Sequence, residues 1–502
     1  MRRLASVLGL AVLLAACGGG GTGSTPCCTE PPIEQALAGA AHVTSVVEST
    51  GDLPAGLRDL GYRLFRLEIE QPADHLVAGG ATFQQFASLL WKGHGLPVVF
   101  ATNGYGAART PGRSEPAALL GANQLAVEHR FFAPSAPVPL DWSLLTIGQA
   151  AADHHLVVES LKPVLGGKWI STGASKGGMT AVYHRRFWPD DVDGTVAYVA
   201  PTSTSTSDPA YVTFLESVGT PACRQALKDA QHALLARRAE VQPLFEAAPA
   251  PGDGYTTFGP EKAFDYAVVE LSFAFWQYGP GLPACANIPA PDAAAATLFA
   301  WMDATLFGVA DWIGDASLDY YAPYYYQSAT QLGGPAYPQD HLLDVLPGGI
   351  PADDLPELYP PLGVTKTWDA AAMPDVSGWV TASGAHILFV YGENDPWSSR
   401  PFEPDAANDA FRYFVPAGNH GSSLSQLPAA DHAEAVSTLQ RWAGVVSTAL
   451  TVTPEPGVDF DPWALLEGER GIAAVRDRTP KSETGPGGGP GAPYLDAPAR
   501  VR

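Results

Sequence analysis

The sequence is poor in positive charge and in long hydrophobic segments, and each shortage excludes a class of protein. Its 502 residues include 29 Lys and Arg against 52 Asp and Glu, so the formal net charge is −23 at pH 7. A balance this acidic argues against binding to nucleic acid, whose phosphates need basic partners. Beyond the N-terminus no uninterrupted apolar run reaches about 18 residues, so the body of the chain is expected to be soluble.

Metal-binding patterns are also lacking, and cysteines are few. No His-Glu-x-x-His occurs, and none of the five cysteines has a histidine at zinc-type spacing. Residues 190–194 resemble the start of a calcium loop but lack the distal glutamate, so we interpret them as a turn. We therefore expect no metal and no cofactor. In an oxidising compartment Cys223 and Cys285 can pair, and so can Cys27 and Cys28 with other partners. Connectivity does not follow from the sequence, and we favour a Cys223–Cys285 disulfide.

The N-terminus has the pattern of a secretory signal peptide. Arg2 and Arg3 precede an apolar segment, residues 4–14, that is too short to cross a bilayer. Cys17 directly follows small residues, which resembles a lipobox and predicts lipidation at Cys17 after removal of residues 1–16. An ordinary signal peptide with an incidental cysteine is the alternative. Loss of the two arginines changes the net charge from −23 to −25. We expect an exported protein that is lipid-anchored to the bacterial cell envelope or surface, or released from it, with the anchor as its only membrane contact.

Composition separates both ends from the folded part of the chain. Residues 17–50 begin with a Gly/Ser/Thr stretch and are expected to form a flexible tether. Residues 451–502 are rich in Pro and Gly, which favours a disordered tail.

Between these ends, short apolar runs bounded by Gly, Pro or Asp predict a sheet. Residues 62–70 and 82–91 alternate in polarity, as an antiparallel pair does. The later runs are nearly continuously hydrophobic, which favours parallel strands buried on both faces; they are 97–102, 124–128, 168–172, 194–199, 386–391 and 412–415. Helical segments alternate with these strands, so we predict an α/β doubly wound fold.

The strand–helix alternation stops between residues 203 and 375. Residues 214–247 and 293–313 have apolar positions at helical spacing instead. Because strand patterning resumes afterwards, we interpret 203–375 as a mainly helical lid inserted between two parts of the core, 51–202 and 376–450. An independent second domain is the alternative.

The most informative motif is Gly173-Ala174-Ser175-Lys176-Gly177. An apolar strand leads into it and a helix-compatible segment follows, which is the pattern of a nucleophile elbow. Such a turn lifts a serine Oγ clear of the sheet, and its glycines leave room where a Cβ would collide. In a chain with 52 glycines the pentapeptide alone is a weak signal. The strand–turn–helix context makes Ser175 a candidate nucleophile.

Two later strands end in turns that carry the partners a serine needs. Asp395 follows one and His420 follows the next, so the chain order is Ser…Asp…His, as in the α/β-hydrolase fold. We predict that Ser175 attacks an acyl carbon, that His420 takes its proton, and that Asp395 orients the imidazole. Asp395 as a turn cap and His420 as a surface-loop residue are the alternatives. Glu393 is the second choice for the acid.

An oxyanion hole needs a second N–H besides that of Lys176. The strand at 97–102 runs into a Gly-rich loop, where such a donor normally lies. Gly104 and Tyr105 are the candidates, and a plain tight turn is the alternative.

Several segments, in order along the chain, resemble one peptidase family. They are Gln71 to His75, Gly80 to Gln85, Thr102 to Gly106, Val127 to Phe132, Gly173 to Met179 and Tyr198 to Pro201. This series is similar to the secreted prolyl tri/tetrapeptidyl aminopeptidases of actinobacteria, which are related to the lysosomal prolyl carboxypeptidases, over residues 60–445. The resemblance implies a serine exopeptidase that releases short N-terminal peptides, with proline favoured before the cut.

The resemblance also brings forward Glu128, at the end of the fourth predicted strand. An exopeptidase needs a carboxylate to pair with the α-ammonium of its substrate, and Glu128 is the candidate. A structural pair with Arg130 or Arg109 is the alternative. Peptides are therefore the expected partners. The same triad suits an esterase, since the acyl chemistry is shared, whereas a non-catalytic surface lipoprotein would need a broken triad.

Overall fold

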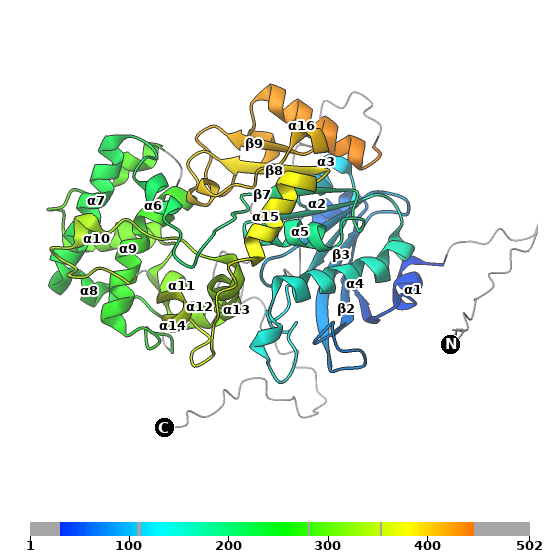
Figure 1. The fold of residues 1–502 in the computed structure, drawn as a ribbon, viewed down its shortest axis with the longest axis horizontal. Coiled ribbons are helices and arrows are strands. Elements are labelled where there is room, and N and C mark those ends of the chain that lie inside the picture. Colours follow the sequence, from blue (N-terminus) through cyan, green and yellow to red (C-terminus); the bar gives the residue numbers. More distant parts are fainter. Residues whose placement is uncertain (1–30, 108–111, 251, 280–281, 352–353, 446–502) are drawn as a thin grey trace, which may run out of the picture.

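The structure is a computed structural model that describes residues 31–107, 112–250, 252–279, 282–351 and 354–445. The expected signal peptide, the lipidation candidate Cys17 and the tail at 451–502 lie outside the described residues. In the described part, a sheet covered by helices lies beside a group of helices from the middle of the chain (Figure 1).

A single nine-stranded sheet has the order β1-β2-β3-β5-β4-β6-β7-β8-β9. Strands β1 to β3 pair antiparallel, and β3 pairs antiparallel with β5, whereas all pairings among β4 to β9 are parallel. Strands β4 to β8 are buried along their whole length, as their continuous apolar sequences predict. The strands are β1 (Val43–Glu48), β2 (Arg63–Pro72), β3 (Thr82–Trp91), β4 (Val98–Thr102), β5 (Asn123–Val127), β6 (Trp169–Ala174), β7 (Gly194–Tyr198), β8 (Ile387–Gly392) and β9 (Phe411–Val415).

Helices cover both faces of the sheet. On one face α4, α5 and α15 pack through an apolar cluster that includes Val182 and Phe389. On the other face α3 and α16 pack through a cluster that includes Ile170 and Leu439. The helices of this part are α1 (Ile33–Ala38), α2 (Ala55–Asp59), α3 (Glu115–Leu120), α4 (Ile147–Leu165), α5 (Lys176–Phe187), α15 (Ala372–Ser383) and α16 (Ala429–Trp442).

The prediction of a tether up to residue 50 is wrong for its last part. Helix α1 buries Ile33 and Leu37 in the same cluster as strands β2 to β5. Strand β1 then pairs antiparallel with β2 at the sheet edge. An edge strand with mostly half-exposed side chains carries little periodic signal, so its sequence does not distinguish it from a linker.

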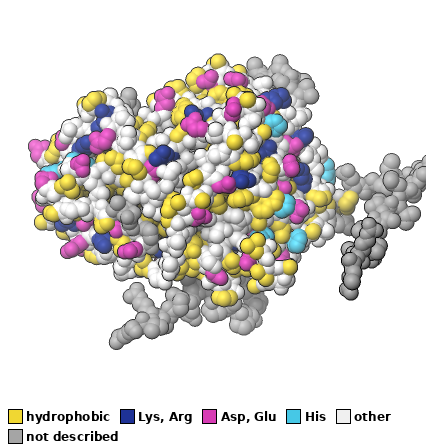
Figure 2. Space-filling model, viewed as in Figure 1, with side chains coloured by type: hydrophobic (Ala, Val, Ile, Leu, Met, Phe, Trp, Pro, Cys, Tyr) yellow, Lys and Arg dark blue, Asp and Glu magenta, His cyan; other side chains and the backbone are white. Residues whose placement is uncertain are grey.

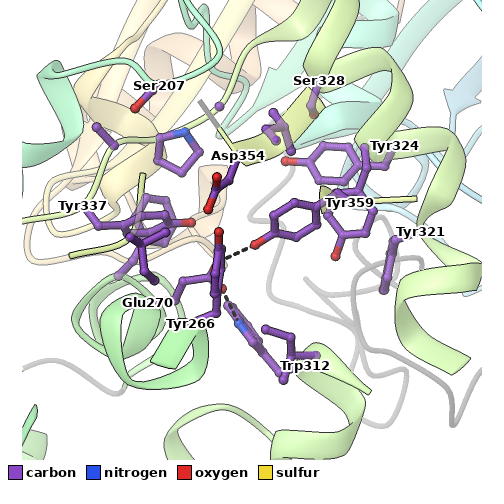
Figure 3. Close-up of a pocket in the computed structure, with 18 of the residues that line it drawn as sticks. Ser207, Tyr266, Glu270, Trp312, Tyr321, Tyr324, Ser328, Tyr337, Asp354 and Tyr359 are labelled. Carbon is purple, nitrogen blue, oxygen red and sulfur yellow. Dashed lines mark hydrogen bonds between the residues drawn. The ribbon is translucent and has the colours of Figure 1, made fainter. Parts of the chain in front are cut away.

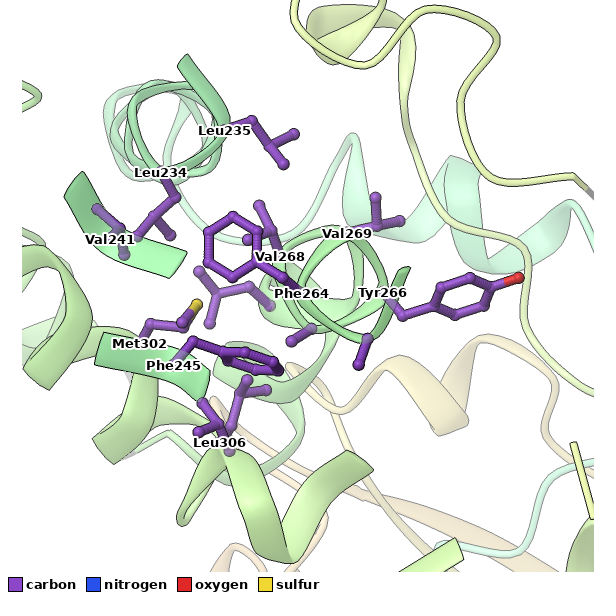
Figure 4. Close-up of a cluster of buried hydrophobic side chains, with 14 of the residues drawn as sticks. Leu234, Leu235, Val241, Phe245, Phe264, Tyr266, Val268, Val269, Met302 and Leu306 are labelled. Carbon is purple, nitrogen blue, oxygen red and sulfur yellow. The ribbon is translucent and has the colours of Figure 1, made fainter. Parts of the chain in front are cut away.

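Between β7 and β8 the chain forms the helical insertion. Its core gathers apolar side chains of α7, α8, α9 and α10, among them Phe245, Phe264, Val268 and Met302 (Figure 4). Helix α15 already packs on the sheet, so the insertion ends slightly before residue 375. The helices are α6 (Ala210–Leu215), α7 (Pro221–Ala236), α8 (Arg238–Glu246), α9 (Pro260–Tyr278), α10 (Ala295–Thr305), α11 (Val309–Ile313), α12 (Asp315–Tyr320), α13 (Ala322–Gln327) and α14 (Asp354–Leu358).

A disulfide joins Cys223 in α7 to Cys285, with the two Cα atoms 5.3 Å apart. On the face drawn in Figure 2, acidic side chains are spread over both halves of the molecule rather than gathered in one patch. Within the described ranges, no helix combines the length and apolarity needed to cross a membrane. Nor do His, Cys, Asp and Glu side chains of those ranges form a group of three that could hold a metal ion.

Candidate active site

Ser175 lies in the turn between β6 and α5, with the backbone strain expected of a nucleophile elbow. Its φ is 52°, in the left-handed region that residues with a Cβ rarely adopt. A Cβ on Gly173 would lie 2.2 Å from the carbonyl oxygen of Gly177, so only glycine fits at position 173. The N–H of Ser175 donates to the carbonyl of Tyr198 at 2.9 Å, which fixes the turn against β7.

Asp395 and His420 meet at the ends of β8 and β9. His420 Nδ1 and Asp395 Oδ2 are 2.8 Å apart, and both side chains are fully buried. Asp395 also accepts hydrogen bonds from the N–H of Trp397 at 3.2 Å and the hydroxyl of Ser398 at 3.1 Å. Burial raises the pKa of Asp395, although the imidazole and these donors act in the opposite direction. This geometry is the one that holds a catalytic imidazole in one orientation.

The rival acid is placed elsewhere. Glu393 is exposed, and its carboxylate accepts a hydrogen bond from the N–H of Ala417 at 3.1 Å. Of the two carboxylates on this turn, Asp395 is therefore the one that contacts His420.

The insertion helps to position His420. The backbone N–H of His420 donates to the carbonyl of Gln277, in the last turn of α9, at 2.9 Å. The amide of Asn419 donates to the carbonyl of Gly279 at 2.8 Å. The imidazole ring also packs edge-on against Tyr278, with the ring centroids 5.9 Å apart. The loop that carries the histidine is thus built against the end of α9.

The loop after β4 and the first turn of α5 form one wall next to the elbow. A Cβ on Gly104 would lie 2.5 Å from the nitrogen of Gly177 and 2.7 Å from the carbonyl carbon of Lys176. The Lys176 ammonium donates to the carbonyl of Gly104 and lies 5.5 Å from the ring centroid of Tyr105. Burial lowers the pKa of Lys176 well below its ordinary value. The structure thus brings together the three residues predicted for the oxyanion hole.

A cavity of about 300 Å³ lies between Ser175 and the helical insertion. Tyr105, Ser175 and Trp397 line it from the sheet side, and residues of α9, α11, α13 and α14 line it from the other side. Figure 3 shows that much of its wall is aromatic. Among the described residues that line it are the carboxylates of Glu270, Asp311 and Asp354, but no Lys, Arg or His.

Glu128, predicted to bind the substrate amine, is not among the residues that line this cavity. It is only 2% exposed. One carboxylate oxygen accepts from the N–H of Ala107 at 2.9 Å, and the other from the hydroxyl of Ser135 at 2.8 Å. These bonds join the loop after β4 to the segment after β5. Its burial away from the cavity wall and its bonds to the chain's own donors favour the structural alternative for Glu128 over binding of the substrate amine.

Other polar residues near the sheet are held in internal pairs. Arg130, a predicted partner of Glu128, instead binds Asp153 at 2.7 Å, and Arg109 lies outside the described residues. His155 and His184 both contact Asp191 at 2.9 Å. These contacts hold α4, α5 and the turn before β7 together.

Sequence reasoning missed Glu270. It lies in α9, is 8% exposed, and accepts hydrogen bonds from Trp312 Nε1 at 2.6 Å and from the Tyr359 hydroxyl at 3.0 Å (Figure 3). Burial raises its pKa. The available signal was a single carboxylate in the otherwise uncharged run 266–276. Burying a carboxylate is costly unless it is paired or hydrogen-bonded, so an acid in such a run indicates a specific role.

A mostly parallel sheet with a serine on a strand–helix turn, and with an Asp–His pair at later strand ends, defines an α/β-hydrolase of the serine hydrolase class. The chain matches the family described as PS-10 peptidase S37 over residues 55–465. It belongs to this family of serine peptidases.

A prolyl tri/tetrapeptidyl aminopeptidase of Streptomyces mobaraensis is 42% identical over 396 residues, which cover 78% of this chain and 82% of that protein. Among solved structures, VinJ has 12% identity and a TM-score of 0.33, with 80% of this chain and 99% of that chain covered. A proline iminopeptidase of Mycobacterium smegmatis has 15% identity and a TM-score of 0.30, covering 75% of this chain and 98% of that chain. These structural likenesses are distant, and the fold assignment rests on strand order and connectivity.

Proposed function

We propose that this serine peptidase is an exopeptidase that releases short N-terminal fragments, of three or four residues, with proline favoured before the cut. The observation that carries the proposal is the acidic and largely aromatic cavity that extends from Ser175 to the insertion. The carboxylates on its wall, with no basic residue among the described ones that line it, suit the positively charged N-terminus of a peptide. The activity named for the Streptomyces mobaraensis relative supports the same substrate class.

In the proposed reaction, Ser175 Oγ attacks the carbonyl carbon before the scissile bond while His420 removes its proton. The C–N bond then breaks, His420 returns the proton to the leaving amine, and an acyl-enzyme remains for water to hydrolyse. Asp395 keeps the imidazole oriented and balances its transient charge. The N–H of Lys176 and one from the Gly104–Tyr105 loop receive the oxyanion.

The test of this function compares three substrates on purified protein. They are a free-amine Xaa-Xaa-Pro chromogenic peptide, its N-blocked form, and a short acyl ester. We expect the free-amine peptide to have the highest kcat/KM and Ser175→Ala to abolish all three activities. Hydrolysis of the ester without cleavage of either peptide would contradict the proposal and leave an esterase.

We also infer that the protein is exported and lipid-anchored through Cys17. The charged start, the short apolar segment and the cysteine after small residues support this inference, and so does the Cys223–Cys285 disulfide, since such bonds persist in oxidising compartments. Mature protein should partition into detergent, and Cys17→Ser should release soluble protein with unchanged kcat. A mature N-terminus with unmodified Cys17, found by mass spectrometry, would refute it.

A further inference from the structure

Glu270 presents a negative charge to the cavity that nothing on the cavity wall neutralises. Its donors, Trp312 Nε1 and the hydroxyls of Tyr359 and Tyr337, are neutral groups. A carboxylate has about four acceptor sites, so these bonds leave room for another donor. No described residue that lines the cavity is basic, while Asp311 and Asp354 add further acidic groups. The cavity is therefore built to receive a cation.

Polar atoms around Glu270 point to a ligand that donates several hydrogen bonds. The hydroxyls of Tyr266 and Ser328 line the cavity on side chains that are 4% and 1% exposed, and neither has a hydrogen-bond partner among the described residues. The same holds for Oδ2 of Asp354, whose carboxylate points toward the centre of the cavity in Figure 3. Buried polar groups are almost always paired, so several exceptions on one cavity wall indicate a polar occupant.

An α-ammonium group matches this set of acceptors. It carries a full positive charge and three N–H donors, which the carboxylates and hydroxyls can accept together. Burial raises the pKa of both Glu270 and Asp354. A bound ammonium would reverse that effect, because an opposite charge nearby favours the ionised carboxylate.

Helix α9 sets the spacing between this group and the site of cleavage. Glu270 lies seven residues before Gln277, whose carbonyl holds His420, which corresponds to about 10 Å along a helix axis. An extended peptide spans at most about 3.3–3.6 Å per residue, so three residues cover about the same length. Four residues fit if the chain bends, as proline favours.

We propose that Glu270, with Asp354 and the Tyr266 hydroxyl, binds the α-ammonium of the peptide substrate and so sets the length of the released fragment. This inference rests on the proposed exopeptidase function. It replaces the role that the sequence suggested for Glu128.

The decisive variant is Glu270→Gln, which keeps the shape and can still accept from Trp312 or Tyr359. On a free-amine Ala-Ala-Pro chromogenic peptide its kcat/KM should fall by about 10- to 100-fold, the usual effect of losing a buried charge-assisted bond. On the N-acetylated peptide and a short acyl ester the loss should be much smaller, since neither has an ammonium. Cleavage of a longer peptide should give fragments of mixed length by mass spectrometry.

Glu128→Gln is the matched control, because it removes a buried carboxylate that does not line the cavity. It should lower kcat/KM equally on all three substrates and lower the Tm. Asp354→Asn changes a side chain that is partly exposed, and it should also reduce cleavage of the free-amine peptide. This variant replaces Glu270→Gln in the test if Glu270→Gln fails to fold.

Equal losses on the three substrates for Glu270→Gln, or an unchanged preference for the free amine in a folded variant, would overturn the assignment of Glu270. If only Asp354→Asn folds, an unchanged preference of that variant for the free-amine peptide would also overturn the assignment of Glu270. A wild-type enzyme that cleaves the acetylated peptide as well as the free one would instead overturn the exopeptidase function itself.

Discussion

Gly104→Ala would place a methyl group between the loop after β4 and the first turn of α5. The new Cβ would lie 2.5 Å from the nitrogen of Gly177 and 2.7 Å from Lys176, and real Cβ atoms essentially never come within 3.0 Å of such neighbours. Both neighbours are backbone or backbone-proximal atoms in the elbow, so a side-chain rotation cannot relieve the contact. The loop and the elbow must separate.

The separation needed is at least the difference between 3.0 and 2.5 Å, or 0.5 Å. Overpacking of this kind costs about 1–3 kcal/mol of stability, which lowers the Tm by only a few degrees in a domain of this size. Catalysis is more sensitive, because a misplacement of about 1 Å costs about 10²-fold in rate. We therefore expect kcat to fall by about 10- to 100-fold while most of the protein remains folded.

The assay measures kcat on the free-amine peptide and on the ester, together with the Tm. Gly378→Ala is the control, since Gly378 is exposed within α15 and a Cβ there meets nothing within 4 Å. That change should raise stability by about 0.5–1 kcal/mol through helix propensity and leave kcat unchanged. If Gly104→Ala keeps kcat within about twofold of wild type, the loop after β4 does not form the oxyanion wall and the reasoning fails.

Four further predictions concern the triad and the disulfide. Ser175→Ala should lower kcat by about 10⁶-fold with an unchanged Tm, and any substantial residual turnover would remove it from the mechanism. Asp395→Asn should lower kcat on the order of 10³–10⁴-fold, and a larger loss in Glu393→Gln would reassign the acid. Because burial raises the pKa of Asp395 and protonation removes the carboxylate that orients His420, the acid limb of kcat should lie above the pH expected of an ordinary aspartate. A limb at or below that pH would contradict this. Reducing the Cys223–Cys285 bond, with a sequence separation of 62, should cost up to about 4 kcal/mol, measured as a lower Tm in reductant; an identical Tm would show that the bond adds no stability.

The sheet and the nucleophile turn were accessible to sequence reasoning because their signals are local. Strands β4 to β8 are buried on both faces, so each is a short run in which apolar residues predominate. Ser175 and Asp395 follow two of these runs and His420 follows the partly buried β9, and the parallel order brings the three strand ends to one edge. Strand β1 was missed because its neighbours cover it on only one side.

Glu128 and Glu270 show where local reasoning fails. The sequence places Glu128 at a strand end, but only the folded chain shows that the N–H of Ala107 and the hydroxyl of Ser135 occupy its oxygens. Glu270 lies in the middle of a buried helix, and its distance from the elbow depends on how the insertion docks. Tertiary contacts between segments far apart in sequence decide both roles.

The bond from the His420 N–H to the carbonyl of Gln277 has a consequence for protein engineering. Helix α9 would bind the N-terminus of the substrate, and it also supports the loop that carries His420. A change in α9 should therefore affect substrate specificity and catalytic rate together. A chimera that takes its insertion from a relative would shift the imidazole along with the binding wall. Grafts should therefore retain the last turn of α9. New specificities are better sought in α11, α13 and α14, which line the cavity and, within the described ranges, make no backbone hydrogen bond to His420.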